Sequence, residues 1–523
     1  MAIQQLVSDL VDRAREQQPR PFLSASLTFL VLVVTFQLVR AIYNLYFHPL
    51  ASIPGPILAR CSRIWYVYHL LRGQLPFAVY RAHQKYGPAL RIAPDELAFV
   101  GNDTWKDIYG FSHGSGGEMP KDPLFYLNTA AGELSIIAAP SSRHGELRRL
   151  MSHGFSERAL RAQEPIIQHY LDYFILRLRG LAEKGAEANL VDWYNFFTFD
   201  VIGDLAFAEP FDCLKNSKNH PWIDDAFDVL VIGSLMRATD YYPLLKRIIL
   251  TFIPKRVFQG FANHVKYMKE KALNRLHMKT DRLDFMTRMA APGAGLTEEE
   301  FIASADTVLL GGSETTATLL SGVTYYLLKN PRVLQKLVEE IRTKFQSEED
   351  ITLAGVNSLN YMLACLDEAF RLYPPVAGAL PRRTREGDTI GGKYVTPNTT
   401  VAIYQWAMYR NPEYFTEPEE YIPERWMGDP RFKNDNRSVV QPFSYGPRNC
   451  IGRNLAYVEM RLTLARLLFS FDIEPTPCLE GWINQKVFLL WQKHPLWVKL
   501  RARGVPLRKE LVALAAGEQQ ELK

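Results

Sequence analysis

The hydrophobic pattern of the chain predicts a membrane-spanning helix ahead of a large folded body. Residues 21–39, between Arg20 and Arg40, carry no charge, and a helix of that length spans about 28 Å, close to the hydrocarbon thickness of a bilayer. The polar segment 1–20 and the lack of a small-residue cleavage site favour a retained anchor over a cleaved signal peptide or a buried helix. The flanking charges do not settle the orientation of this anchor.

The rest of the chain reads as a linker, one domain and a tail. Residues 40–60 are rich in proline, which blocks helix formation, so we expect a stiff hinge. Residues 61–502 contain no internal repeat and no long flexible linker, so we expect a single catalytic domain there. The closing segment 503–523, rich in Glu, Ala and Gln, is expected to be a C-terminal tail.

Within the body, helical periodicity dominates and strand patterns are short. Residues 88–101 alternate apolar and polar positions, which predicts strands of a small sheet. Thr297 and Glu300 form a capping box that opens a helix, and its periodicity runs to Asn330 and stops at Pro331. The fold class is therefore mainly α with a small β region.

Composition narrows the function classes. The net charge of +5 is spread along the chain with no basic run, which excludes nucleic acid as the expected partner. The five cysteines are scattered and include no CxxC pair, which argues against a disulfide framework or a zinc site. A reducing compartment fits this cysteine usage.

Cys450 carries the strongest chemical signal. It follows the tight-turn residues Gly446 and Pro447 and precedes an apolar run at helical spacing, so a buried helix should begin just after it. A thiol at a helix N-terminus faces unpaired N–H groups, which predicts a lowered pKa. Arg448 adds a charge suited to a carboxylate. The alternative is a buried structural cysteine in a glycine-rich turn.

Phe443, Gly446, Arg448, Cys450 and Gly452 match the FxxGxRxCxG signature of the cytochrome P450 haem-thiolate enzymes, which the chain resembles over residues 45–502. The resemblance implies a cytochrome P450 fold behind a single N-terminal transmembrane helix. It implies haem b as cofactor, with the iron held by the axial thiolate of Cys450. It also places Arg448, Phe443 and Gly452 at the haem.

A second motif lies in the middle of the long helix that begins after Thr297. Two glycines, Gly311 and Gly312, cost about 1 kcal/mol each relative to alanine, so we expect a local widening of the helix or a close helix–helix contact there. The stretch Gly311–Thr316 resembles the [A/G]-G-x-[D/E]-T-[T/S] motif of the family. The resemblance makes Thr315 the residue that hydrogen-bonds oxygen and Glu314 the acid that relays protons.

Three basic positions are candidates for holding the haem propionates. His144 and Arg148 lie four residues apart on one helix face, which by itself is often only a solvated face. Their place resembles the C helix of the family, where a pair at this spacing binds propionate. Arg382 is the candidate second ligand, with Arg383 as its competitor.

A further set is expected to support the fold. Glu368 and Arg371 form an ExxR pair, a weak signal alone, and the Pro-Glu-Arg stretch that contains Arg425 follows at a suitable distance. In the family these two motifs form a buried salt-bridged cluster, so the resemblance assigns these residues a structural role.

Two other stretches leave alternatives open. Residues 110–123 form a glycine-rich loop whose G-x-S-x-G has no strand before it and no helix after it, so we interpret the serine-hydrolase motif as coincidence. In the family this loop shapes the substrate pocket. Residues 221–260 are either an ordinary core helix and loop or the region that roofs that pocket.

Together these features predict a monooxygenase that oxidises an apolar small molecule with O2. The phrases Tyr46–Leu50 and Asp200–Phe207 resemble filamentous-fungal members that tailor secondary metabolites such as terpenoids, polyketides or alkaloids. The sequence has no dinucleotide-binding fingerprint after a predicted strand. We therefore expect a separate NADPH-cytochrome P450 reductase to supply the electrons, with cytochrome b5 as a further donor. The expected docking region is the locally basic sequence near Cys450, which contains Arg431, Lys433, Arg437 and Arg453.

The resemblance implies a single-pass protein of the endoplasmic reticulum membrane whose catalytic domain faces the cytosol. Two other functions remain open. A haem-thiolate isomerase or dehydratase would not use O2, and such relatives usually lack the pair Glu314 and Thr315. A non-catalytic haem-binding sensor or carrier in the membrane would have no use for that pair.

Overall fold

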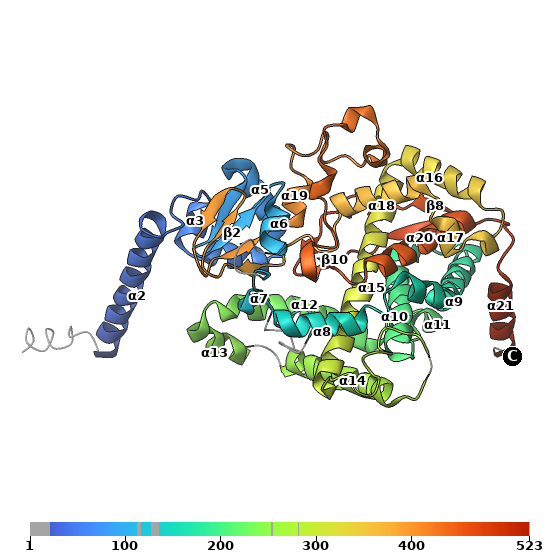
Figure 1. Ribbon diagram of the computed structural model, residues 1–523, viewed down its shortest axis with the longest axis horizontal. Coiled ribbons are helices and arrows are strands. Elements are labelled where there is room, and N and C mark those ends of the chain that lie inside the picture. Colours follow the sequence, from blue (N-terminus) through green and yellow to red (C-terminus); the bar gives the residue numbers. More distant parts are fainter. Residues whose placement is uncertain (1–20, 112–116, 127–134, 253–254, 281, 522–523) are drawn as a thin grey trace, which may run out of the picture.

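The computed structural model describes residues 21–111, 117–126, 135–252, 255–280 and 282–521. It confirms a mostly helical fold with small sheets: a sheet region with its own core lies beside a larger helical region (Figure 1). The serine of the G-x-S-x-G motif, Ser112, lies outside the described residues.

The first helix, α2 (Pro21–Tyr46), extends away from the body (Figure 1). Its segment Ala25–Tyr46 has a mean hydropathy of 2.0 and is long and apolar enough to cross a membrane. The helix continues into the stretch expected as a hinge, and its last turn is bound to the body. Asn44 Nδ2 donates to the carbonyl of Cys61 at 2.8 Å, and Arg91 Nη1 donates to the carbonyl of Asn44 at 2.8 Å.

The largest sheet has four strands in the order β1-β2-β7-β4. Strands β1 and β2 are antiparallel, which confirms the prediction for residues 88–101, while β2 and β7 are parallel and β7 and β4 antiparallel. A separate hairpin, β5–β6, turns at Gly391 and Gly392, both with positive φ. The elements of this region are α3 (Ile57–Cys61), α4 (Ile64–Leu71), α5 (Leu75–Tyr86), β1 (Ala89–Ala93), β2 (Glu96–Phe99), α6 (Thr104–Tyr109), α7 (Pro123–Tyr126), β4 (Arg382–Arg383), β5 (Asp388–Ile390), β6 (Lys393–Val395), β7 (Thr400–Ala402) and α19 (Gln405–Tyr409).

The helical region is built around α15, which runs through the middle of the body beside α10 (Figure 1). Two smaller sheets, β3-β11-β8 and β10-β9, complete it. Its α-helices are α8 (Ser141–Met151), α9 (Glu157–Glu183), α10 (Leu190–Phe207), α11 (Cys213–Asn216), α12 (Pro221–Asp240), α13 (Pro243–Phe252), α14 (Lys255–His277), α15 (Glu298–Lys329), α16 (Pro331–Lys344), α17 (Leu353–Val356), α18 (Asn360–Leu372), α20 (Arg453–Ser470) and α21 (Lys509–Glu521). Its strands are β3 (Ala188–Asn189), β8 (Phe471–Pro475), β9 (Lys486–Val487), β10 (Trp491–Gln492) and β11 (Trp497–Ala502).

Short 3-10 helices connect these elements, and the one that bears on the site is η6 (Gly446–Arg448), directly before Cys450. The others are η2 (Glu348–Asp350), η3 (Pro423–Met427), η4 (Pro430–Phe432), η5 (Arg437–Val439) and η7 (Pro477–Leu479). The C-terminal helix α21 packs against α9 with Leu511 buried, and Arg508 Nε lies 3.2 Å from Asp172 Oδ1.

Helix α15 begins as the sequence predicts. The Thr297 side chain accepts from the backbone N–H of Glu300, and the Glu300 carboxylate accepts from that of Thr297. The helix then continues for 32 residues to Lys329, which corresponds to about 48 Å. Pro331 starts the next helix, because a proline is tolerated in a first helical turn but not in a helix interior.

The two glycines of α15 have different surroundings. A Cβ at Gly312 would lie 2.4 Å from Ile202 Cδ1 of α10, so this glycine permits the close packing of the two helices. A Cβ at Gly311 would meet no atom within 4 Å, so open space lies in front of it. The helix is α-helical without interruption through both positions. The expected widening is therefore not present, and the expected close helix contact is.

Candidate functional site

The loop before α20 holds Cys450 in a defined position. The N–H of Cys450 donates to the carbonyl of Phe443 at 2.8 Å, and the Phe443 ring packs edge-on against Phe370 at a centroid distance of 5.1 Å. Gly446 has φ +75°, and a Cβ there would lie 2.1 Å from the carbonyl oxygen of Tyr109. Only glycine fits this turn, which explains its place in the motif.

The Cys450 thiol lies at the start of α20, as predicted, and is accessible to solvent although protein atoms surround it. The backbone N–H groups of Gly452 and Arg453 hydrogen-bond to the sulfur, and the charge of Arg148 acts on it. These groups lower the pKa of the thiol, but burial outweighs them and raises it above its ordinary value. The predicted low pKa is therefore wrong for the free thiol. A metal ion bound to the sulfur would remove the proton outright.

A cluster of basic side chains surrounds one carboxylate beside the cysteine loop. Arg448 Nη2 lies 2.6 Å from Glu118 Oε1, and Arg382 Nη1 lies 3.5 Å from Glu118 Oε2. Arg448 Nη1 and Arg382 Nε are buried and have no hydrogen-bond partner among the described residues. Burial and the charges of these two arginines lower the pKa of Lys121 well below its ordinary value. The cluster therefore retains N–H groups and positive potential for another anion.

Helix α8 places its two candidate residues on the same side of the molecule as this cluster. His144 is buried, and burial together with the charge of Arg448 lowers its pKa to about 4, so the imidazole is neutral at pH 7. Arg148 Nη1 donates to the carbonyl of Asn449 at 2.6 Å, next to Cys450. His144 can thus act as a neutral donor, and Arg148 as a cation.

The structure separates the two competing arginines of β4. Arg382 is 3% exposed, and its Nη1 also donates to the carbonyl of Met119 at 2.8 Å, on the side of the Glu118 cluster. Arg383 points to a different partner, with Nη2 lying 3.2 Å from Asp122 Oδ2. Arg382 is therefore the one that joins Arg448.

Thr315 and Glu314 point to different surroundings on α15. Thr315 Oγ1 donates to the carbonyl of Gly311 at 2.7 Å, and its side chain is partly exposed beside the open space in front of that glycine. Glu314 is 2% exposed and forms an ion pair with Lys493. Lys493 Nζ also donates to Thr318 Oγ1 at 3.0 Å.

Burial raises the pKa of Glu314, although the charge of Lys493 and its hydrogen bond oppose this effect. One carboxylate oxygen, Glu314 Oε2, is buried and has no hydrogen-bond partner among the described residues. This oxygen is therefore available to accept a hydrogen bond in the interior.

The supporting cluster is assembled as predicted. Glu368 is fully buried and accepts from Arg371 Nη2 at 2.8 Å and from Arg425 Nε at 3.3 Å. Trp426 Nε1 donates to Glu368 at 2.8 Å, and the N–H of Ile422 donates at 3.1 Å. One carboxylate thus connects α18 to the η3 segment below the cysteine loop.

Comparison with known proteins identifies the family. A family model described as Cytochrome P450 matches residues 55–498. The chain is a cytochrome P450.

Curated relatives from fungi agree with this assignment. The chain is 45% identical to the cytochrome P450 monooxygenase tpeC of Talaromyces stipitatus over 481 residues, which cover 90% of this chain and 94% of the relative. It is 43% identical to the cytochrome P450 monooxygenase astA of Talaromyces wortmannii, over 90% of this chain and 96% of the relative. It is 41% identical to the trichothecene C-4 hydroxylase of Trichoderma arundinaceum, over 92% of this chain and 97% of the relative. These relatives support a monooxygenase role.

Cytochromes P450 are haem-thiolate proteins in which a cysteine binds the iron. The residues of this P450 fit that group on three structural observations. The Cys450 thiol is accessible at a helix start, N–H groups of Arg448 and Arg382 lack partners, and open space lies in front of Gly311. The donor set therefore suits a flat cofactor that carries a metal and two carboxylates.

Sequence reasoning missed two residues of this P450 site. Glu118, which pairs with Arg448 and Arg382, lies within the glycine-rich loop predicted at 110–123 and carries no motif. Lys493 pairs with Glu314 from a position 179 residues away in the chain. Neither has a local signal, because both acquire their partners only through the tertiary fold.

Proposed function

We propose that this P450 oxidises an apolar small molecule of fungal secondary metabolism, such as a terpenoid, polyketide or alkaloid. The observation that carries the proposal is the placement of Cys450 at the start of α20 beside a basic cluster with unpartnered N–H groups. The substrate class is supported by the relatives, one of which is named for hydroxylating a trichothecene.

Haem b is the proposed cofactor. Cys450 would bind the iron, while Arg448, Arg382, Arg148 and His144 would hold the propionates. Phe443 and Gly452 support the cysteine loop from either side, the first through its packing on Phe370 and the second through its N–H to the sulfur. When bound, a thiolate-ligated haem supplies the iron chemistry that splits O2 and transfers one oxygen atom.

We assign the delivery of protons for this chemistry to Thr315 and Glu314. The Thr315 hydroxyl lies beside the open space at Gly311, where it can accept a hydrogen bond or turn its proton from the Gly311 carbonyl into that space. Glu314 is the proposed acid next to it in the helix, because burial raises the pKa of its carboxyl group and its Oε2 has no hydrogen-bond partner among the described residues. Lys493 is a positioning residue in this scheme, since it contacts Glu314 but not the open space.

Lys493→Met is expected to raise the pKa of Glu314 further. The ammonium group of Lys493 favours the ionised carboxylate, and removing this opposite charge leaves the effect of burial unopposed. The measurement is an infrared titration of the protonated carboxyl band that disappears in Glu314→Gln. An unchanged midpoint in Lys493→Met would show that the ion pair does not set the protonation of Glu314.

The electrons are proposed to come from a separate NADPH-cytochrome P450 reductase, with cytochrome b5 as a further donor. The four basic residues expected near Cys450 are exposed on the surface, which suits an acidic docking partner. They are Arg431, Lys433, Arg437 and Arg453.

Helix α2 is proposed to anchor the protein in the endoplasmic reticulum membrane as a single pass, with the catalytic domain facing the cytosol. The support is its length, its apolar composition and the exposure of its large apolar side chains from Leu27 to Ile42. Aliphatic side chains exposed to water over such a length are unfavourable, so a lipid environment suits this helix.

The deciding test is the carbon monoxide difference spectrum of the reduced, detergent-solubilised protein beside Cys450→Ser. We expect a strongly red-shifted Soret band in the wild type that the variant loses, because only thiolate ligation produces that shift. A Cys365→Ser variant, which changes a different thiol that is buried, should retain the band. A wild type without the band would overturn the proposed cofactor site and every role that depends on it.

A further inference from the structure

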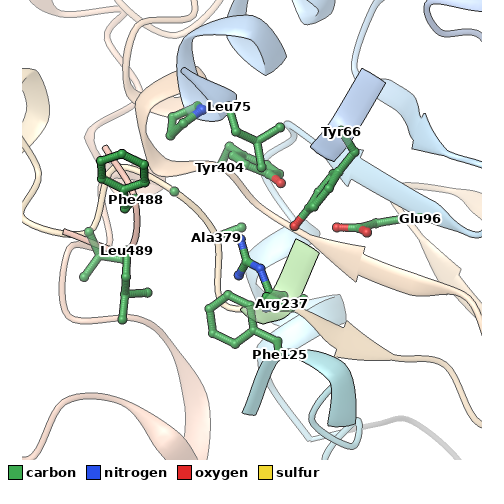
Figure 2. Close-up of a pocket in the computed structure, with 13 residues that line it drawn as sticks. Tyr66, Leu75, Glu96, Phe125, Arg237, Ala379, Tyr404, Phe488 and Leu489 are labelled. Atoms are coloured by element: carbon green, nitrogen blue, oxygen red, sulfur yellow. The ribbon is translucent and has the colours of Figure 1, made fainter. Parts of the chain in front are cut away.

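A pocket beside the four-stranded sheet contains an arginine that forms no ion pair among the described residues. Arg237 of α12 enters this pocket between Phe125 of α7 and Tyr66 of α4 (Figure 2). Its guanidinium carbon lies 4.7 Å from the ring centroid of Phe125 and 5.9 Å from that of Tyr66. Among the described residues, no carboxylate lies within 4 Å of Arg237, and its Nε is buried without a hydrogen-bond partner.

The acid that lines the same pocket is already bound. Glu96 Oε2 lies 2.5 Å from Arg63 Nη1, and the other terminal nitrogen of Arg63 pairs with Asp95. Glu96 therefore acts on Arg237 only through the longer-range field. Tyr66 and Tyr404 cannot supply negative charge at pH 7, because burial raises the pKa of both phenols.

The remainder of the wall is mostly apolar. It includes side chains from the segment after α18 and, from the turn of the β9–β10 hairpin, Phe488 and Leu489 (Figure 2). The apolar lining residues are Leu75, Pro76, Val376, Ala379 and Pro381. A cation without a close counterion in such surroundings is unfavourable in the free protein. The pocket therefore suits a ligand that brings an anion and an apolar body.

Two segments that line the pocket lead to residues of the proposed catalytic site. Pro381, which lines it, is followed directly by Arg382, and Arg382 shares Glu118 with Arg448 of the cysteine loop. The hairpin whose turn lines the pocket leads into Lys493, which binds Glu314. A ligand in this pocket would thus touch both segments that reach the site around Cys450.

We propose that Arg237 binds a carboxylate of the substrate, so that the substrate class is an apolar small molecule bearing an acid group. This inference rests on the proposed function, since it names the kind of molecule that the P450 oxidises. Arginine suits the task because its planar fork donates two parallel hydrogen bonds to a carboxylate. The apolar wall excludes water, which strengthens those bonds.

The test compares acids with their uncharged esters. The full-length, detergent-solubilised haem protein is titrated by calorimetry with abietic acid and methyl abietate, and with dodecanoic acid and methyl dodecanoate. The variants are Arg237→Met, which removes the charge, and Arg237→Lys, which keeps it without the fork. Arg501→Met serves as the control, because Arg501 is 75% exposed and pairs with Glu474 on the surface.

The wild type is expected to bind each acid more tightly than its ester by about 10- to 100-fold, the range for hydrogen bonds to a charged group. Arg237→Met should remove this preference by weakening the acids alone, and Arg237→Lys should retain part of it. Arg501→Met should behave as the wild type. A wild type that binds acids no better than esters would overturn the inference, as would an Arg237→Met variant that weakens both equally.

Thermal unfolding separates ligand recognition from a structural role. Since the Arg237 charge lacks a close partner, Arg237→Met should not lower the unfolding midpoint of the free protein. A midpoint several degrees lower would assign the arginine to the fold and overturn the inference. The calorimetric preference does not depend on haem ligation, whereas the carbon monoxide spectrum does. Failure of the acid site and failure of the proposed function are therefore seen in different measurements.

Discussion

Replacing Thr315 by alanine is expected to uncouple electron consumption from oxidation. The hydroxyl lies beside the open space at Gly311 and can turn its proton from the Gly311 carbonyl into that space, which the methyl group of alanine cannot do. Product per NADPH should fall by about 100-fold, the lower end of what a positioned proton donor contributes, while NADPH consumption continues and hydrogen peroxide accumulates. Parallel assays of NADPH, peroxide and product measure this partition directly.

Thr307→Ala is the matched control for this prediction. Thr307 lies on the same helix, is similarly half-buried, and donates to the carbonyl of Ala303 at 2.9 Å, four residues back, as Thr315 does to Gly311. It should leave the coupling unchanged. Equal coupling in Thr315→Ala and the wild type would remove Thr315 from the proton path. Turnover without O2 or NADPH would instead favour an isomerase or dehydratase.

Glu368→Gln is expected to destabilise the fold strongly. Glu368 is fully buried and is the shared acceptor for Arg371 and Arg425, so neutralising it leaves Arg371 buried without an acid. Breaking such a buried pair costs about 3–5 kcal/mol. The free energy of unfolding in urea should fall by this amount, and the recovery of haem-containing protein should fall with it.

Glu474→Gln provides the comparison on the surface. Its partner Arg501 is exposed, and the Glu474 side chain itself is 53% exposed, so the loss should stay below about 1 kcal/mol. Burial alone would raise the pKa of Glu368, but Arg371 and Arg425 lower it below its ordinary value. Ionised Glu368 therefore stabilises the fold at pH values above the pKa that this carboxyl group has in the unfolded chain. The stabilisation is lost as the pH falls through the pKa of Glu368 in the folded protein. Equal, small losses of unfolding free energy in Glu368→Gln and Glu474→Gln would contradict the role of Glu368 as a buried acceptor.

Interactions between residues that are close together in the chain were the ones best predicted from the sequence. The capping box of Thr297 and Glu300 and the pair Glu368–Arg371 follow from helix geometry, and both are present. Arg425 was added to that pair by resemblance alone, since no local rule connects residues 57 positions apart. The mainly α fold class could be predicted because helical periodicity dominates along the chain and strand patterns are short.

Other properties depend on the tertiary environment. The N–H groups at the start of α20 suggested a low pKa for Cys450, but the desolvation that outweighs them comes from surrounding protein atoms that no sequence pattern shows. The need for glycine at Gly312 comes from Ile202 on a different helix. Arg237 lies in residues 221–260, for which the sequence left open a core helix with a loop or a roof over the substrate pocket. Its lack of a nearby acid among the described residues appears only when α12 packs beside the sheet.

The last turn of α2 has a consequence for how the protein sits at a surface. Since Asn44 is bound to Cys61 and Arg91 on the body, α2 meets the catalytic domain as a rigid stalk, not as a swivelling tether. With α2 crossing a bilayer, its tilt would set the angle of the whole domain and the depth to which its near edge dips into the headgroups. Shortening the chain to remove the apolar segment should therefore stop before Asn44, so that the carbonyl bound by Arg91 remains in place.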